Sequence, residues 1–109
     1  MTKNLQLSLE LKWFEMTKSG QKTEDYREIN NYWKARLTDQ KSNWNRPQSQ
    51  WKFKNFEYNI MTWGYPKKEN LERIVRLEHL CIEIGYGNPE WGAEPDKLYF
   101  IIKHGKILL

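Results

Sequence analysis

Hydrophobic and polar residues alternate strictly in LQLSLEL, which runs from Leu5 to Leu11 with leucine at every odd position. This period of two predicts a half-buried β-strand. The next stretch, KWFEMTKSG, changes to helical spacing, so that Trp13 and Met16 can share one apolar stripe. Gly20 predicts the end of this helix, because glycine favours the position that follows a helix C-terminus.

The stretch TEDYREI returns to a period of two and predicts a second strand, with Asp25 and Arg27 on the same face. NNYWKARL then predicts a second short helix whose N-cap is Asn30 or Asn31. FEYNIMTW predicts a strand that ends at Gly64. LERIVRLEHLCIEI predicts a long strand, bulged where two adjacent apolar residues, Ile74 and Val75, break the alternation.

The chain ends with a loop, GYGNPEWGAEPDK, and a last strand, LYFIIKHGKILL. Together these elements predict an α+β fold, built as a small β-barrel with two short helices between the early strands. A length of 109 residues predicts one domain over residues 1–109. Residues 38–55 are rich in Asn, Gln, Ser and Lys, and they predict a functional loop or a mobile insertion.

Composition narrows the class of protein. Only 39% of the residues are hydrophobic, but aromatic residues make up 15% and can bury large areas. The net charge of +4 suits an anionic partner such as nucleic acid. The chain has no apolar run near 20 residues, so we expect no membrane association and a cytoplasmic location.

The single cysteine, Cys81, excludes an intrachain disulfide and fits a reducing compartment. Cys81 lies two residues from His79, and we predict a buried structural thiol here rather than a Cys–His dyad. His79 and His104 are far apart in the sequence, without Cys or carboxylate at ligand spacing. We therefore predict no metal site and no cofactor.

The first candidate site is GQKTEDYR, which includes Lys22, Asp25 and Arg27. Arg27 can hold a phosphate or a carbonyl by a forked contact, and Lys22 can act as a base if burial lowers its pKa. The alternative is an exposed network of ion pairs along a strand, which contributes little energy.

The second candidate is the loop GNPEWGAEP. Trp91 can stack on a base and Asn88 can read its hydrogen-bonding edge, while Glu90 or Glu94 can act as acid or base. The alternative is a compact loop in which Trp91 only covers one end of the barrel.

The third candidate, KSNWNRPQSQWKFKN, alternates basic and aromatic residues, as a grip on single-stranded nucleic acid does. Its candidates are Lys41, Trp44, Arg46, Trp51, Lys52, Phe53 and Lys54. The alternative is that its aromatic side chains pack down on the barrel. Lys12, Lys18, Lys34 and Arg36 can extend a basic rim.

Gly20, Lys22, Asp25 and Arg27 resemble the pattern Gly-x-Lys-x-x-Glu-x-Arg of ASCH domains, a branch of the PUA-like superfamily, with Asp25 in place of the usual glutamate. The resemblance covers roughly 5–37 and 56–108 and is to the small bacterial and phage type. It implies a PUA-like barrel with a cleft beside the motif strand that binds RNA or nucleotide-like ligands.

One branch similar in fold consists of acetylcytidine amidohydrolases, in which a lysine at the position of Lys22 works with a threonine, here Asp25, and a distal glutamate, for which Glu90 is a candidate. Another branch is described as single-strand ribonucleases. We therefore predict an RNA- or modified-nucleoside-binding domain. The catalytic candidates are Lys22, Asp25 and Glu90, and the binding candidates are Arg27, Tyr26, Asn88, Trp91, Lys12, Arg46, Trp51 and Lys52. The alternatives are a nucleoside hydrolase, a ribonuclease, or a protein-interaction module that uses exposed aromatics between Trp44 and Phe53.

Overall fold

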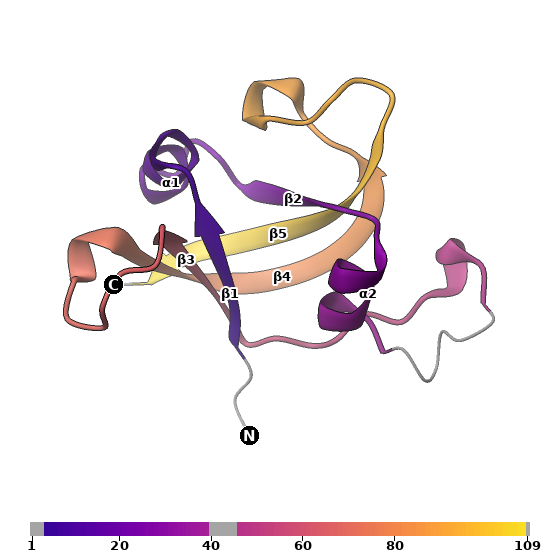
Figure 1. Cartoon of the computed structure of the whole chain (residues 1–109), viewed down its shortest axis with the longest axis horizontal. Helices are drawn as coiled ribbons and strands as arrows, with labels where there is room; N and C mark the ends of the chain where they lie inside the picture. The colour runs from indigo at the N-terminus through magenta and orange to yellow at the C-terminus, as the bar shows by residue number, and fades with distance from the viewer. Residues whose placement is uncertain (1–3, 40–45, 109) are drawn as a thin grey trace. The chain divides into compact units, whose positions relative to one another are not determined.

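Five β-strands and two α-helices form the regular part of the protein, whose computed structural model describes residues 4–39 and 46–108 (Figure 1). The strands are β1 (Asn4–Leu9), β2 (Glu24–Glu28), β3 (Tyr58–Trp63), β4 (Ile74–Tyr86) and β5 (Leu98–Leu108), and the helices are α1 (Leu11–Lys18) and α2 (Asn31–Leu37). The strand order is β1-β3-β4-β5-β2, with β1 parallel and β4 antiparallel to β3. The predicted α+β class is confirmed as a mixed sheet with one short helix after β1 and another after β2.

The chain divides into two compact units. The first unit contains residues 1–24, 56–80 and 103–109, and the second contains 25–55 and 81–102. The boundary between Glu24 and Asp25 divides the motif strand, so each unit is considered by itself.

The core of the first unit starts from the leucine alternation of β1. Leu5, Leu7 and Leu9 are buried, and β1 pairs with β3 from Asn4 opposite Tyr58 onward. The predicted strand is confirmed except at Leu11, which is partly exposed because α1 begins there. A helix changes the direction of successive side chains, so the alternation cannot continue past Glu10.

Helix α1 buries Phe14 and Thr17, and the Thr17 hydroxyl donates to the Trp13 carbonyl over 2.9 Å. Gly20 has a φ of +85° directly after the C-cap residue Ser19. This left-handed conformation confirms the predicted helix end, since glycine adopts it without steric cost.

A polar array crosses the interior of the first unit. Asn59 is fully buried; its amide nitrogen donates to Nδ1 of His104 over 2.7 Å, and its amide oxygen accepts from Nδ1 of His79 over 2.8 Å. An amide nitrogen only donates and an amide oxygen only accepts. Nδ1 of His104 therefore acts as the acceptor, while Nδ1 of His79 carries a proton and donates it. Phe56 packs its ring against His79 at 5.4 Å between centroids.

Burial, followed by the effect of His104, lowers the pKa of His79 below its usual 6.5. The unfolded chain therefore takes up this proton at a higher pH than the folded chain. The contribution of neutral His79 to the free energy of unfolding is complete above about pH 6.5 and is lost as the pH falls below that value toward the lowered pKa.

We expect His79→Gln to reduce this pH dependence of stability, because glutamine can donate to Asn59 but does not titrate. Urea unfolding of both proteins at pH 7.5 and pH 5.5 measures the effect, and equal pH dependence in the two would contradict it.

The core of the second unit centres on β5, where Phe100 and Ile102 are fully buried. The rings of Trp51 and Phe53 lie 6.2 and 6.1 Å from the ring of Phe100. Helix α2 begins as predicted, with Asn30 as the N-cap: its side chain accepts from the backbone N–H of Trp33 over 2.9 Å.

The long strand β4 differs from the prediction in two ways. Leu71–Arg73 forms a 3₁₀ turn, so the strand begins at Ile74, and the burial pattern changes phase after His79. Val75 and Leu77 are buried at odd positions, whereas the next buried residue is Ile82. The prediction of a buried Cys81 was therefore wrong: the thiol is exposed, because the change of phase turns this odd position outward.

Candidate nucleic-acid interface

In the first unit, Lys22 is held by the turn that ends α1. Its backbone N–H donates to the Met16 carbonyl over 3.0 Å, and its side chain is only 2% exposed. The ammonium donates to the Glu24 carbonyl over 2.8 Å and lies 6.0 Å from the centre of the Trp13 ring. Lysine is rarely buried so completely, so this position constrains what Lys22 can contact.

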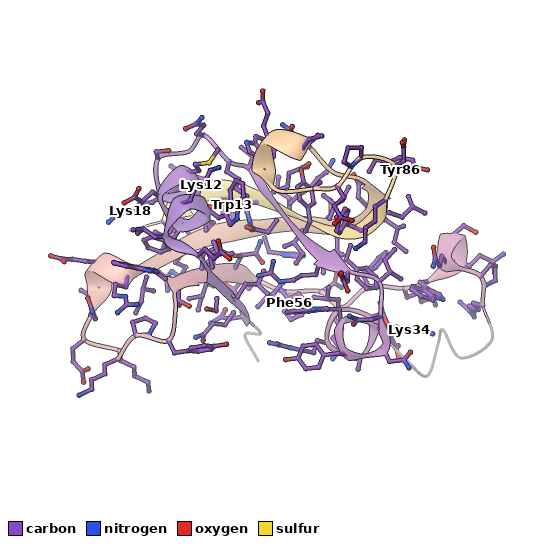
Figure 2. All side chains as sticks on the ribbon, turned by 45° about the horizontal axis from the view of Figure 1, so that its top comes forward. Lys12, Trp13, Lys18, Lys34, Phe56 and Tyr86 are labelled. Carbon is purple, nitrogen blue, oxygen red and sulfur yellow. The ribbon has the colours of Figure 1, made fainter. Side chains whose placement is uncertain are left out.

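Lys12 approaches the same indole from α1. Its Nζ lies 4.7 Å from the centre of the Trp13 ring, and the side chain is exposed (Figure 2). Two predicted candidates, Lys12 and Lys22, are thus brought together around a residue that sequence reasoning assigned only to the apolar stripe of α1. Adjacent lysine and tryptophan in a basic chain were the available signal for Trp13.

In the second unit, β2 carries Asp25 and Arg27. Asp25 is 2% exposed, and Arg27 is half-buried with its Nη1 donating to the Tyr26 carbonyl over 2.8 Å. Burial lowers the pKa of Arg27, the Asp25 carboxylate opposes that effect, and Arg36 lowers the pKa further. The two predicted residues interact as charges, and both are more buried than a solvated ion network requires.

Arg27 and Arg36 share one aromatic partner. Their guanidinium carbons lie 5.2 and 5.1 Å from the centre of the Trp33 ring. Tyr32 packs edge-to-face on Trp33 at 5.0 Å, and its hydroxyl accepts from Arg36 Nη1 over 2.9 Å. Sequence reasoning placed Trp33 and Arg36 in the second predicted helix and named Arg36 also as part of a basic rim. The four-residue separation of Tyr32 and Arg36 was the available signal.

The structure brings Tyr26 and Asn88 together. The Tyr26 hydroxyl accepts from the Asn88 backbone N–H over 2.8 Å, and the Tyr26 ring packs against Tyr99 at 5.8 Å. The Asn88 side-chain oxygen accepts from the Glu90 backbone N–H over 2.9 Å and so caps the 3₁₀ turn Pro89–Trp91.

Trp91 is half-buried at the end of this turn, while Glu90 and Glu94 are exposed. Lys97 forms an ion pair with Glu28 at 3.0 Å, and this hydrogen bond raises the pKa of the lysine. The loop thus offers a partly accessible indole and two solvated carboxylates.

Gly87 fixes the contact between this loop and Tyr26. A Cβ at Gly87 would lie 2.6 Å from Cβ of Ala93 and 2.8 Å from Cζ of Tyr26. We expect Gly87→Ala to destabilise the fold by about 1–3 kcal/mol, because a close-packed loop has to shift. Gly85→Ala is the control, since its Cβ would meet only the flexible end of Ile101 at 3.1 Å. Urea unfolding compares the two, and equal stabilities would show that the loop yields without cost.

The basic and aromatic segment packs in part on the second unit. The Trp51 Nε1–H donates to the Arg46 carbonyl over 2.9 Å, and Lys34 Nζ lies 4.4 Å from the Trp51 ring centre. Trp51 and Phe53 pack against Phe100 as described above, whereas Arg46 and Lys52 are exposed. Lys41 and Trp44 lie outside the described residues. The described aromatics of this segment are therefore half-buried rather than displayed as a contact surface.

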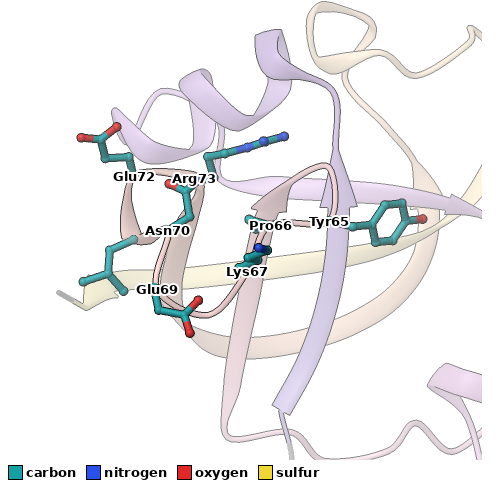
Figure 3. A pocket seen from close by; sticks show the side chains of 8 residues that line it. Tyr65, Pro66, Lys67, Glu69, Asn70, Glu72 and Arg73 are labelled. Carbon is teal, nitrogen blue, oxygen red and sulfur yellow. The ribbon is translucent and has the colours of Figure 1, made fainter.

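An open hollow of about 800 Å³ lies along residues 65–73 of the first unit (Figure 3). Arg73 stacks at 4.3 Å on Trp63 and donates to the Trp63 carbonyl over 3.0 Å, which closes this loop on itself. In Figure 3 the Tyr65 ring and the Glu72 carboxylate point away from one another. Polar groups do not converge here, so the hollow is a weaker candidate than the sites above.

Within residues 4–39 and 46–108, no three His, Cys, Asp or Glu side chains lie together in a way that could hold a metal ion. None of the described helices is long and apolar enough to span a membrane.

Comparisons with known proteins returned no matching family model, curated protein or solved structure. The resemblance to ASCH domains therefore stays a prediction. Convergence of Lys22, in the first unit, with Asp25 and Arg27, in the second, also stays a prediction, as do the roles of Glu90, Asn88, Trp91, Arg46, Trp51 and Lys52.

Proposed function

We propose that the protein is a PUA-like ASCH domain that binds RNA or a modified nucleoside beside the motif formed by Gly20, Lys22, Asp25 and Arg27. The observation that carries this proposal is the buried Lys22 ammonium, which lies beside the indole of Trp13 with Lys12 on the same ring. The motif resemblance adds support for this location.

The chemistry of this cluster suits a nucleoside. A lysine ammonium donates hydrogen bonds and accepts none, so Lys22, which donates to the Glu24 carbonyl, suits an accepting partner such as a base carbonyl. Trp13 is half-buried and offers a ring for stacking, and exposed Lys12 can reach a phosphate. Holding a cation out of water is costly, and such positions are common at functional sites.

The other candidate residues of the proposal lie in the second unit. Arg27 can hold a phosphate or carbonyl by its planar fork, while Asn88 and Trp91 lie on the loop that Tyr26 supports. Arg46 and Lys52 are exposed cations for a longer RNA, and Trp51 lies beside Lys34. No observation favours a hydrolase or ribonuclease over binding, and the binding experiment also detects turnover.

We expect a ligand that binds the native protein to raise its melting temperature. At a ligand concentration one hundred times Kd the gain is about 2.7 kcal/mol. Cytidine, acetylcytidine, uridine and a short single-stranded RNA are titrated in turn, and each mixture is then separated by chromatography. Lys22→Met should abolish the shift, because methionine keeps most of the side chain's length but donates no hydrogen bond. Lys68→Met, on the exposed 65–73 loop, is the control.

A shift of wild-type size in Lys22→Met would show that the binding site lies elsewhere. If Lys22→Met does not fold, Lys12→Met tests the exposed side of the same cluster. A changed nucleoside or a cut RNA in the chromatogram would identify an enzyme.

A further inference from the structure

Helix α2 concentrates cations and aromatic rings without a carboxylate. Its sequence is NYWKARL, and it has no acidic residue in its first turn or elsewhere. Tyr32 is 60% exposed and Arg36 is exposed, while Trp33 and Lys34 are partly exposed. Figure 2 marks the position of Lys34 on this helix. Among the described residues, neither Lys34 nor Arg36 has a carboxylate within ion-pair distance.

Two guanidinium groups compete for one indole beside this helix. Arg27 and Arg36 both lie within 5.2 Å of the Trp33 ring centre, and their mutual repulsion is one cause of the lowered pKa of Arg27. Asp25, whose carboxylate opposes this effect, is buried on β2. The exposed side of the cluster therefore keeps a positive charge that an anion from solution would neutralise.

The exposed ring of Tyr32 lies beside this charge. Arg36 donates to its hydroxyl and stacks at 5.6 Å from its ring centre. A base that stacks on Tyr32 would place its own phosphate within reach of Arg36. On the same helix Lys34 lies against Trp51 and adds a further cation.

We infer that α2, with Arg27 from β2, is a contact surface for single-stranded RNA. Arg36 and Lys34 bind phosphates, and one unpaired base stacks on Tyr32. Single strands are favoured over duplex because only unpaired bases offer a face for stacking. An acidic peptide would match the charge but would make no use of the exposed ring. This inference rests on the proposed function and specifies RNA, with contact residues other than those around Lys22.

The test is fluorescence anisotropy with a labelled single-stranded oligouridylate of twelve nucleotides. Arg36→Gln should weaken binding about fivefold to tenfold and reduce the slope of log K against log salt by about 0.7, the value for one phosphate contact to a single strand. Tyr32→Leu should weaken binding by at least fivefold and leave the salt slope unchanged, because stacking releases no counterion. Tyr32→Phe should retain the affinity, and Lys68→Gln is the control for general charge.

The outcomes separate this inference from the proposed function. If Lys22→Met weakens binding while Arg36→Gln and Tyr32→Leu bind like wild type, the α2 surface is wrong and the proposed function stands. Nucleoside binding without oligouridylate binding would likewise overturn the α2 surface alone. If only the α2 variants weaken binding, the Lys22 site fails and the inference stands.

A competing acidic polymer gives a further outcome. An oligoglutamate that binds as tightly as the RNA, with no effect of Tyr32→Leu on either affinity, would overturn the inference. Binding of neither nucleosides nor RNA overturns both. Thermal melting checks that each variant is folded, as expected for the Tyr32, Arg36 and Lys68 variants because these positions are exposed.

Discussion

The burial of polar side chains is the constraint on which this fold depends. With only 39% hydrophobic residues, the protein fills part of its interior with polar groups, and each group needs a partner to offset the loss of water. In the described part of the chain, every buried side-chain nitrogen and oxygen has a hydrogen-bond partner. Asn59 shows how specific this requirement is, because its two amide ends fix the tautomers of His104 and His79. The polar interior therefore selects one arrangement where an apolar one would tolerate several.

The same constraint applies to the charged side chains of Lys22 and Asp25. Each is 2% exposed, and removing a charge from water costs several kcal/mol unless the site compensates it. The Lys22 ammonium has the Glu24 carbonyl and the Trp13 ring, and Asp25 interacts with Arg27. A hydrophobic pair of similar volume would stabilise a fold as well or better. Stability alone therefore does not explain why charged residues occupy these two motif positions.

How far the sequence predicted the structure depended on whether the deciding interactions were local. The Gly20 helix end and the Asn30 cap were predictable, because each depends on a few neighbouring residues. The exposure of Cys81 was not, because the burial phase of β4 depends on packing from other parts of the chain. Asn59 gave no signal at all, since its partners His79 and His104 are 20 and 45 residues away. Arg27 was predicted as a site residue, but its aromatic partner Trp33 was not, because their contact joins a strand to a helix.

Cation–aromatic pairs recur on this protein, and their differences decide which of them suits a ligand. Arg73 stacks on Trp63 and donates to the carbonyl of that same residue, so its donors and its ring contact serve the loop itself. The pair thereby replaces part of the hydration of both groups, and a structural role is enough to explain it. The charges around Trp33 are less well compensated. The guanidiniums of Arg27 and Arg36 repel each other across one ring, and the carboxylate of Asp25 is buried. A fold gains little stability from such repulsion. A phosphate would turn this repulsion into attraction, and for this reason α2 suits RNA better than the pair of Arg73 and Trp63 does.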